Sequence, residues 1–235
     1  MSLKASTVSK KILIADDEED ILEIISFQLL KEGFDIKTAK DGNQALALIT
    51  SFNPDMVLLD IMMPFKTGIE VCEILRTNPK FNDTLIVFLT ALNDDETHIK
   101  CLELGADDFI TKPISPKIIA TKVNTLFRRY KDNLDADAEN IITINTMQIN
   151  GGQYTVTNNG TTTVLARKEF ELLQFLASNT KRIFLRNEIL DKVWGSEVIV
   201  GDRTIDVHIR KIRLKLNVDC IITVKGVGYR FNENF

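Results

Sequence analysis

The 235-residue sequence contains few cysteines and histidines, and it has no long hydrophobic run. No apolar stretch approaches the roughly 20 residues that a membrane helix needs, so we expect no membrane span and a cytoplasmic location. The three cysteines are widely spaced and form no CxxC pair, which gives no support for a disulfide framework or a zinc site. The two histidines, His98 and His208, lie too far apart in sequence to suggest a histidine-rich metal site.

Charge is distributed unevenly along the chain, although the formal net charge is only −4. Residues 1–140 contain 16 lysines and arginines against 24 aspartates and glutamates, a net charge of −8. Residues 141–235 contain 13 against 9, a net charge of +4, and the two values together give −4. The asymmetry indicates one part that handles a metal ion or cationic groups and another that meets a polyanion, although ordinary surface variation can produce the same split.

Short apolar segments alternate with segments of helical period between residues 11 and 130. The expected strands, each rich in Ile, Val, Leu or Phe, are residues 11–15, 35–39, 56–59, 85–89 and 108–111. Between them, apolar residues recur at spacings of three and four, which is the period of an amphipathic helix. The alternation predicts an α/β domain with a doubly wound, five-stranded parallel sheet of the flavodoxin-like kind.

Changes in composition predict the domain organisation. We expect residues 1–10 to be a leader, residues 11–130 the first domain, and the polar, acidic residues 131–140 a linker. Residues 141–235 form the expected second domain, which begins with β-rich segments and Asn-Gly turn signals. Helical segments at 167–178, 186–194 and 203–216 follow, and strand-like segments at 220–224 and 228–231 close the chain. Helices followed by a terminal hairpin predict an α+β winged helix-turn-helix domain.

Charged and polar residues follow the expected strands of the first domain. Asp16 and Asp17 come after the first strand, Asp60 after the third, Thr90 after the fourth and Lys112 after the fifth. Singly, each has an ordinary explanation, such as capping the next helix. However, the carboxyl ends of parallel strands meet at one edge of the sheet, and neighbouring carboxylates repel unless a cation neutralises them. Because Mg²⁺ prefers carboxylate, water and phosphate oxygens, the set predicts a site for Mg²⁺ and a phosphoryl group, with Asp60 as the nucleophile.

The motifs IADDEE, LLDIMMP, FLTA and GADDFITKP make residues 11–130 resemble the receiver domains of two-component response regulators. The resemblance implies that Asp60 accepts a phosphoryl group from a histidine kinase. It also implies that Asp17, Asp60 and the backbone carbonyl of Met62 ligate Mg²⁺, and that Asp16 holds a metal-bound water.

The resemblance assigns a second set of residues to the phosphoryl group and to the switch. Lys112 would contact the phosphoryl oxygens, and the Lys112–Pro113 peptide bond would be cis. Thr90 would donate its hydroxyl to the phosphate, with the switch aromatic Phe109 turned inward behind it. Relatives usually carry tyrosine at this position, and phenylalanine has no hydroxyl to distinguish the inward and outward positions. An ordinary core role for Phe109 stays open.

Residues 203–216, RTIDVHIRKIRLKL, combine an apolar face with a basic one. Their apolar residues recur at spacings of three and four, at Ile205, Ile209, Ile212 and Leu216. Five basic residues stand against a single acid, Asp206. Such a helix fits the major groove of DNA, although a solvated basic helix would show the same charge pattern.

Together with VWG and VKGVGYRF, this helix makes residues 141–233 resemble the effector domain of OmpR/PhoB response regulators. The resemblance implies a recognition helix at 203–216. Expected to face the bases are Val207, Arg210 and Lys211, with Asp206 as a further candidate. Expected nearer the phosphates are Arg203, Thr204, His208 and Arg213. Lys225, at the tip of the terminal hairpin, would approach the minor groove, where relatives often place arginine.

The subfamily resemblance also implies partners other than the kinase. Phosphorylated receivers would form a symmetric homodimer whose face includes Lys100, Asp107, Ile118 and Lys122. Ile118 stands where relatives usually carry glutamate, and its alternative role is packing inside its own domain. Two winged helices would bind direct-repeat half-sites in promoter DNA, and residues 195–202 would contact RNA polymerase.

The whole sequence therefore predicts a phosphorylation-controlled, DNA-binding transcription regulator and not an enzyme. One rival is a stand-alone phosphotransferase or phosphatase that uses the acidic pocket, but it leaves the basic helix without a purpose. The other is a phosphorylation-independent DNA-binding regulator with a vestigial receiver, and the complete acidic pocket argues against it.

Overall fold

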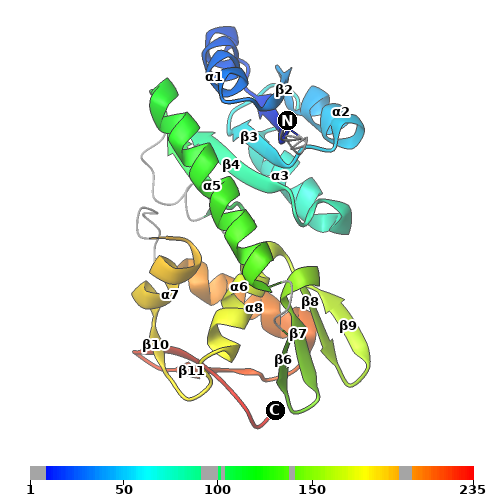
Figure 1. The fold of residues 1–235 in the computed structure, drawn as a ribbon, viewed down its shortest axis with the longest axis vertical. Coiled ribbons are helices and arrows are strands. Elements are labelled where there is room, and N and C mark those ends of the chain that lie inside the picture. Colours follow the sequence, from blue (N-terminus) through cyan, green and yellow to red (C-terminus); the bar gives the residue numbers. More distant parts are fainter. Residues whose placement is uncertain (1–8, 91–99, 102–103, 138–140, 196–202) are drawn as a thin grey trace, which may run out of the picture. The chain divides into compact units, whose positions relative to one another are not determined.

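The computed structural model describes residues 9–90, 100–101, 104–137, 141–195 and 203–235. They form two compact units, one mainly of residues before Thr125 and the other mainly of residues after it, and each is described by itself. Figure 1 shows the elements of both units in chain order. Among the described helices, none is long and apolar enough to cross a bilayer.

A parallel sheet forms the centre of the first unit (Figure 1). Its strands are β1 (Lys11–Ala15), β2 (Asp35–Ala39), β3 (Met56–Asp60), β4 (Leu85–Thr90) and β5 (Asp108–Thr111), in the spatial order β2-β1-β3-β4-β5. Strands β3 and β4 are buried along their whole length, which explains their continuous apolar sequences. The edge strand β2 is mostly exposed and polar. This order confirms the predicted doubly wound, five-stranded sheet.

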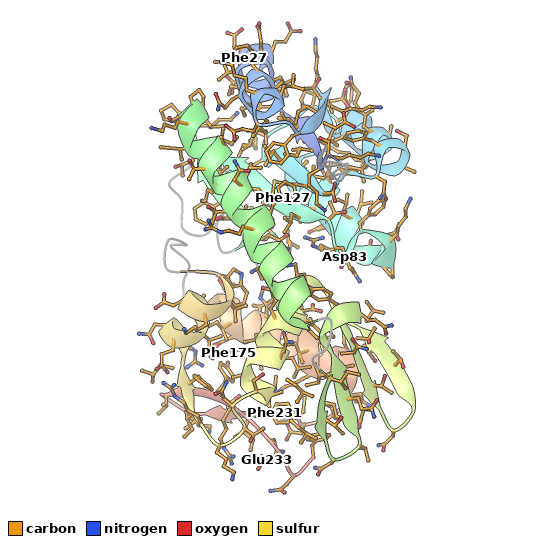
Figure 2. The ribbon with its side chains drawn as sticks, viewed as in Figure 1. Phe27, Asp83, Phe127, Phe175, Phe231 and Glu233 are labelled. Carbon is orange, nitrogen blue, oxygen red and sulfur yellow. The ribbon has the colours of Figure 1, made fainter. Side chains whose placement is uncertain are left out.

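Helices α1 (Glu19–Lys31) and α2 (Gly42–Phe52) and most of α3 (Gly68–Thr77) belong to the first unit, and α5 (Pro116–Asp137) begins in it. A 3-10 turn at Pro79–Phe81 follows α3. Helix α1 buries Leu22, Ile25 and Leu29 at helical spacing. Its Phe27 points outward from the unit and is mostly exposed (Figure 2). Helix α5 continues to Asp137, into residues 131–140 that were predicted as a linker. The predicted domain boundaries themselves stay a prediction.

An antiparallel sheet opens the second unit. Its strands β6 (Ile141–Ile144), β7 (Met147–Asn150), β8 (Thr155–Asn158) and β9 (Thr161–Val164) pair in sequence order, with a 3-10 turn at Gly151–Gln153. Asn159 and Gly160 both have positive φ angles, of 48° and 79°, as a two-residue hairpin turn requires. The hairpins predicted from the turn signals are therefore present.

Helices and a second small sheet complete this unit. The elements are α6 (Arg167–Ala177), β10 (Phe184–Leu185), α7 (Arg186–Val193), α8 (Arg203–Leu216), β11 (Ile221–Val224) and β12 (Gly228–Phe231). Phe231 and Phe175 both belong to this unit (Figure 2). Phe231 is fully buried, and the Phe175 ring packs at a tilt against Phe184, with ring centroids 4.5 Å apart. Strand β10 joins the terminal hairpin in the order β10-β12-β11, a pairing that the sequence did not predict. The helices and the hairpin confirm the winged helix-turn-helix prediction.

Candidate functional site

The ammonium of Lys112 lies among three carboxylates at the carboxyl end of the parallel sheet. Its Nζ atom is 2.8 Å from Asp16 Oδ2, 2.9 Å from Asp60 Oδ1 and 2.9 Å from Glu18 Oε1. Asp16 is fully buried and Asp60 is only 6% exposed, whereas Glu18 is on the surface. The structure thus brings together Asp16, Asp60 and Lys112, which the sequence had placed at three strand ends, and Lys112 supplies the cation that the buried carboxylates need.

Asp60 is held at both of its carboxylate oxygens. The backbone N–H of Met62 donates a 2.6 Å hydrogen bond to Oδ2, and Lys112 contacts Oδ1. Burial raises the pKa of Asp60 above its usual value, and the charge of Asp16 adds to this effect, while the hydrogen bonds from Lys112 and Met62 oppose it. The Asp60 carboxylate is therefore a fixed, poorly solvated base whose charge depends on a nearby cation.

Lys112 keeps its charge in this pocket. Burial alone would lower its pKa, but hydrogen bonds to Asp16, Asp60 and Glu18 outweigh burial and raise the pKa above its usual value. The position of Lys112 is set by the backbone, because its N–H donates a 2.6 Å hydrogen bond to the carbonyl oxygen of Thr90. The Lys112–Pro113 peptide bond is cis, as predicted.

Thr90 and Phe109 lie on neighbouring strands beside the pocket. Thr90 ends β4 and is 1% exposed, whereas Phe109 in β5 is only partly buried. The ammonium of Lys122 lies 5.5 Å from the centroid of the Phe109 ring and donates a 2.5 Å hydrogen bond to the Phe109 carbonyl. The phenylalanine ring is thus next to a cation on α5, and its part in a switch stays a prediction.

The donor set of the pocket fits a hard divalent cation. Asp16 and Asp60 contact the same ammonium, and Asp17 is exposed beside them. Among the described residues, no group of three or more acidic, histidine or cysteine side chains is already arranged to hold a metal ion. We attribute this to Lys112, which lies between the two buried carboxylates. The chemistry of the pocket nevertheless suits Mg²⁺, because carboxylate oxygens are ligands that Mg²⁺ prefers.

Two residues of the pocket were missed by the sequence analysis. Glu18 supplies the third carboxylate at Lys112, and it is the acid that directly follows Asp16 and Asp17. Gly68 begins α3, and a Cβ atom there would lie 2.1 Å from the carbonyl oxygen of Asp60. Only glycine therefore allows α3 to start this close to the Asp60 backbone.

Helix α8 buries one face and leaves part of the predicted basic face exposed. Ile205, Ile209 and Ile212 are buried, while Arg210 is exposed and Lys211 and Val207 are partly exposed. The side chain of Arg203 lies outside the described part of the chain. Lys225 is exposed in the turn between β11 and β12.

Asp206 lies near the start of α8 and contacts two other elements. Its Oδ1 atom is 2.9 Å from Arg186 Nε, at the start of α7, and accepts a 2.6 Å hydrogen bond from the Tyr229 hydroxyl of β12. The Arg186 guanidinium also lies 5.0 Å from the centroid of the Tyr229 ring. None of these partners had been recognised in the sequence, because they are separated by 20 and 23 residues from Asp206.

Thr204 and His208 are buried instead of facing solvent, with exposures of 0% and 1%. The His208 ring makes a 2.9 Å hydrogen bond with the Thr204 carbonyl oxygen and an edge contact with Trp194 at a centroid distance of 5.0 Å. Burial lowers the pKa of His208 to about 4, although the bond to Thr204 acts in the opposite direction. In this conformation neither side chain reaches a phosphate, which counts against the two contacts predicted for them.

Arg213 is also engaged within the chain. Its guanidinium donates hydrogen bonds to the carbonyl oxygen of Ile221 and to the hydroxyl of Thr223, at 2.7 and 2.9 Å. Lys215, two residues farther along α8, forms an ion pair with Glu169 of α6, with 2.7 Å between Lys215 Nζ and Glu169 Oε2. The exposed cations that remain on this surface are thus fewer than the sequence suggested, and Arg210 and Lys225 are the clearest of those described.

Comparisons with known proteins agree with both halves of this description. Residues 12–124 match the family model "Response regulator receiver domain", and residues 160–231 match "Transcriptional regulatory protein, C terminal". The chain is 34% identical over 225 residues to the sensory transduction protein RegX3 of Mycolicibacterium smegmatis, covering 93% of this chain and 97% of that protein. It is 31% identical to DrrB, a Thermotoga maritima OmpR/PhoB homologue, over 96% of this chain and all of that one, with a TM-score of 0.47. A solved mutant of RitR superposes with a TM-score of 0.73 at 26% identity, covering 96% of this chain and 100% of that one.

The chain belongs to the OmpR/PhoB family of response regulators. The matching receiver and effector domains, joined in one chain, make it a phosphorylation-controlled, DNA-binding transcription regulator. Membership implies a histidine kinase and DNA as its partners, and receiver domains generally bind Mg²⁺ at the phosphorylation site.

The residues predicted to form the dimer face of this response regulator differ in their exposure to solvent. Ile118 on α5 is 60% exposed, which excludes the alternative that it packs inside its own domain in this conformation. Lys100 is exposed as well. Asp107, in contrast, is buried and lies 2.9 Å from Arg76 of α3, so its charge is already paired within the chain. This pairing counts against a role for Asp107 in contacts between two copies.

Proposed function

We propose that Asp60 is the residue through which this response regulator is controlled, by accepting a phosphoryl group from a histidine kinase. The observation that carries the proposal is the 2.9 Å contact between Asp60 Oδ1 and the Lys112 ammonium at the carboxyl end of the sheet. In the transfer, an Asp60 carboxylate oxygen forms a bond to phosphorus while the bond between phosphorus and the kinase histidine nitrogen breaks. The product is an acyl phosphate, and the kinase histidine recovers its nitrogen lone pair.

Lys112 supports this step through its charge. The phosphoryl group brings negative charge to a pocket that already contains the buried carboxylate of Asp16, so the ammonium must neutralise part of it. We expect Lys112 to exchange its contact with Asp60 Oδ1 for one with a phosphoryl oxygen. Glu18 and Asp16 keep the ammonium at the pocket during the exchange.

Asp16, Asp17, Asp60 and the carbonyl of Met62 would hold Mg²⁺. When bound, the ion supplies further neutralisation of the transferred charge. The Thr90 hydroxyl would then donate to the phosphate, and Phe109 would report the change to the outer face of β5. The proximity of Thr90 to Lys112 through a backbone hydrogen bond supports this assignment.

The output is DNA binding by α8 and the terminal hairpin. We assign base contacts to Val207, Arg210 and Lys211, because they lie on the side of α8 opposite its buried isoleucines. Lys225 would approach the minor groove. Phosphorylated receivers would pair as a homodimer, and the paired effector domains would bind direct-repeat half-sites in promoter DNA. The DNA-bound dimer would then contact RNA polymerase in the cytoplasm. Of residues 195–202, which we assign to the contact with polymerase, residues 196–202 lie outside the described part of the chain.

The decisive experiment measures intact mass after incubation with a small phosphodonor such as phosphoramidate. We expect one phosphoryl adduct on the wild-type protein, none on Asp60→Ala, and none when a chelator removes Mg²⁺. The matched control is Asp83→Ala, which removes an exposed aspartate of the same chain and should leave labelling unchanged. A full adduct on Asp60→Ala, or undiminished labelling in chelator, would refute the proposal.

A second measurement tests control of DNA binding. A pool of random-sequence duplexes is selected with the phosphorylated protein, and the affinity for a selected duplex is compared with and without phosphodonor. We expect phosphodonor to increase the affinity of the wild-type protein and to leave that of Asp60→Ala unchanged. Equal affinity of the wild-type protein under both conditions would favour the phosphorylation-independent rival.

A further inference from the structure

Three side chains from three elements of the second unit meet at one carboxylate oxygen. We call Asp206 of α8, Arg186 of α7 and Tyr229 of β12 the Asp206 cluster. Asp206 Oδ1 receives Arg186 Nε at 2.9 Å and the Tyr229 hydroxyl at 2.6 Å, and Arg186 donates a longer, 3.4 Å bond to the same hydroxyl. All three pairs of the cluster are therefore in contact.

The cluster fixes the start of α8 relative to the terminal hairpin. Tyr229 is 3% exposed and pairs with Phe184 on one side and Thr223 on the other, so its hydroxyl has little freedom to move. Arg186 is the first residue of α7, and its guanidinium lies over the Tyr229 ring. Because neither partner belongs to α8, each hydrogen bond to Asp206 ties the first turn of the helix to a different element.

The cluster also removes one positive charge from the surface around α8. Arg186 is paired with the Asp206 carboxylate, and the side chain of Arg186 is 21% exposed. Hydrogen bonding to Asp206 raises the pKa of Arg186, and burial raises the pKa of Tyr229 to about 12, so both groups remain proton donors at neutral pH. In addition, the Asp206 carboxylate lies in the first turn of α8, where the helix dipole favours a negative charge.

We propose that Asp206 is a positioning residue for DNA recognition, which contacts no base itself and instead holds Arg186 and Tyr229 so that α8 and the terminal hairpin keep one relative arrangement. The inference rests on the proposed role of α8 as the recognition helix. It departs from the sequence-based expectation that Asp206 is a base-contact candidate. In this proposal the Asp206 carboxylate neutralises Arg186, so Arg186 contributes little to the electrostatic attraction between the protein and DNA phosphates.

The test compares Asp206→Asn, Arg186→Met and the double variant in the full-length protein. Asparagine keeps the size of the side chain and an acceptor oxygen but removes the charge that neutralises Arg186. The slope of log affinity against log salt concentration is measured on a random-sequence duplex pool. We expect a steeper slope for Asp206→Asn, by up to about 0.9, because one more cation is available to phosphates. Arg186→Met and the double variant should keep the wild-type slope.

Base preference supplies the second readout. Duplexes selected from the random pool by Asp206→Asn and by the wild-type protein are sequenced and compared. A positioning residue changes all positions of the preferred sequence to the same degree, whereas a base contact loses preference at one base pair. Asp191→Asn is the matched control, because it removes an exposed acid of α7 and should change neither readout.

Each outcome decides between the alternatives. Loss of preference at a single base pair in Asp206→Asn, persisting in the Arg186→Met background, would overturn the proposal, and so would an unchanged salt slope. The fluorescence of Trp194 shows whether Asp206→Asn folds. If it does not fold, the salt slope of Arg186→Met decides alone: a slope lower than that of the wild-type protein would show that Arg186 binds a phosphate and would overturn the proposal. Failure of the wild-type protein to bind any duplex would instead refute the role of α8.

Discussion

The guanidinium of Arg213 donates a 2.7 Å hydrogen bond to the carbonyl oxygen of Ile221 and thereby joins α8 to β11. The resemblance to OmpR/PhoB effector domains had implied that Arg213 lies near a DNA phosphate. In the structure its charge satisfies a backbone acceptor and the Thr223 hydroxyl. A charged hydrogen bond of this kind contributes roughly 1.5 to 3 kcal/mol to stability.

We therefore expect Arg213→Ala to lower the free energy of unfolding of the second unit by roughly 1.5 to 3 kcal/mol. Urea unfolding followed by the fluorescence of Trp194, the single tryptophan of the chain, measures this. Arg210→Ala is the control, because Arg210 is exposed and its loss should change stability by about 0.5 kcal/mol or less. If Arg213→Ala instead leaves stability intact and lowers the salt slope of DNA binding by about one, the original phosphate assignment was right.

Stability should depend on pH through His208. The folded protein lowers the pKa of this buried imidazole from 6.5 to about 4, so between these values the unfolded state binds more protons than the folded state. The contribution of His208 is thus complete above pH 6.5 and is lost progressively as the pH falls toward 4. From this shift we expect a loss of about 3 kcal/mol across the window.

The measurement is the urea midpoint of Trp194 fluorescence at pH 7.5 and at pH 5. His208→Gln has no imidazole to protonate, so its midpoint should differ less between the two pH values than that of the wild-type protein. An equal pH dependence in both proteins would show that other groups are responsible.

Gly68→Ala should disturb the pocket around Asp60. The added Cβ atom would lie 2.1 Å from the carbonyl oxygen of Asp60, so α3 or the end of β3 must shift. We expect a loss of about 1 to 3 kcal/mol in stability and slower labelling by phosphoramidate. Gly160→Ala is a useful comparison, because it lies in a hairpin turn of the second unit and costs about 1 kcal/mol through its positive φ. Normal labelling of Gly68→Ala would contradict the expectation.

The receiver dimer should be weak and should depend little on salt. Ile118 is exposed where a charged residue would supply an ion pair, and Asp107 is already paired with Arg76. Each missing exposed pair costs at most about 1 kcal/mol. Sedimentation of the protein bound to beryllofluoride, at several concentrations and salt strengths, measures the dimer. A tight dimer that Ile118→Glu disrupts would show that apolar packing governs this surface.

The sequence predicted the parallel sheet because its central strands are buried on both faces and are therefore apolar throughout. Residues 56–59 and 85–89 differ from β3 and β4 only by the polar residues Asp60 and Thr90 at their carboxyl ends. Strand β10 was not predicted, because two residues are too few to show a period. The extension of α5 to Asp137 was not predicted either, since acidic and polar residues are compatible with both a linker and a solvent-exposed helix.

The proximity of site residues could be predicted where chemistry and sequence position coincide, but not where tertiary packing brings distant elements together. Asp16, Asp60 and Lys112 could be brought together because all follow strands of one parallel sheet. The partners of Asp206 come from α7 and β12, and no local pattern joins these elements to α8. The family resemblance placed His208 near a phosphate, but it could not show that the ring is buried against Trp194.

Gly228 limits how the terminal hairpin can vary. A Cβ atom at this position would lie 1.9 Å from the carbonyl oxygen of Phe184, on the neighbouring strand β10. Lys225 and Val227, at the tip, are exposed and have no such restriction. In a library randomised over residues 225–228, functional clones should therefore retain glycine at 228 while residues 225 and 227 diversify, so the tip can be varied without rebuilding the sheet beneath it.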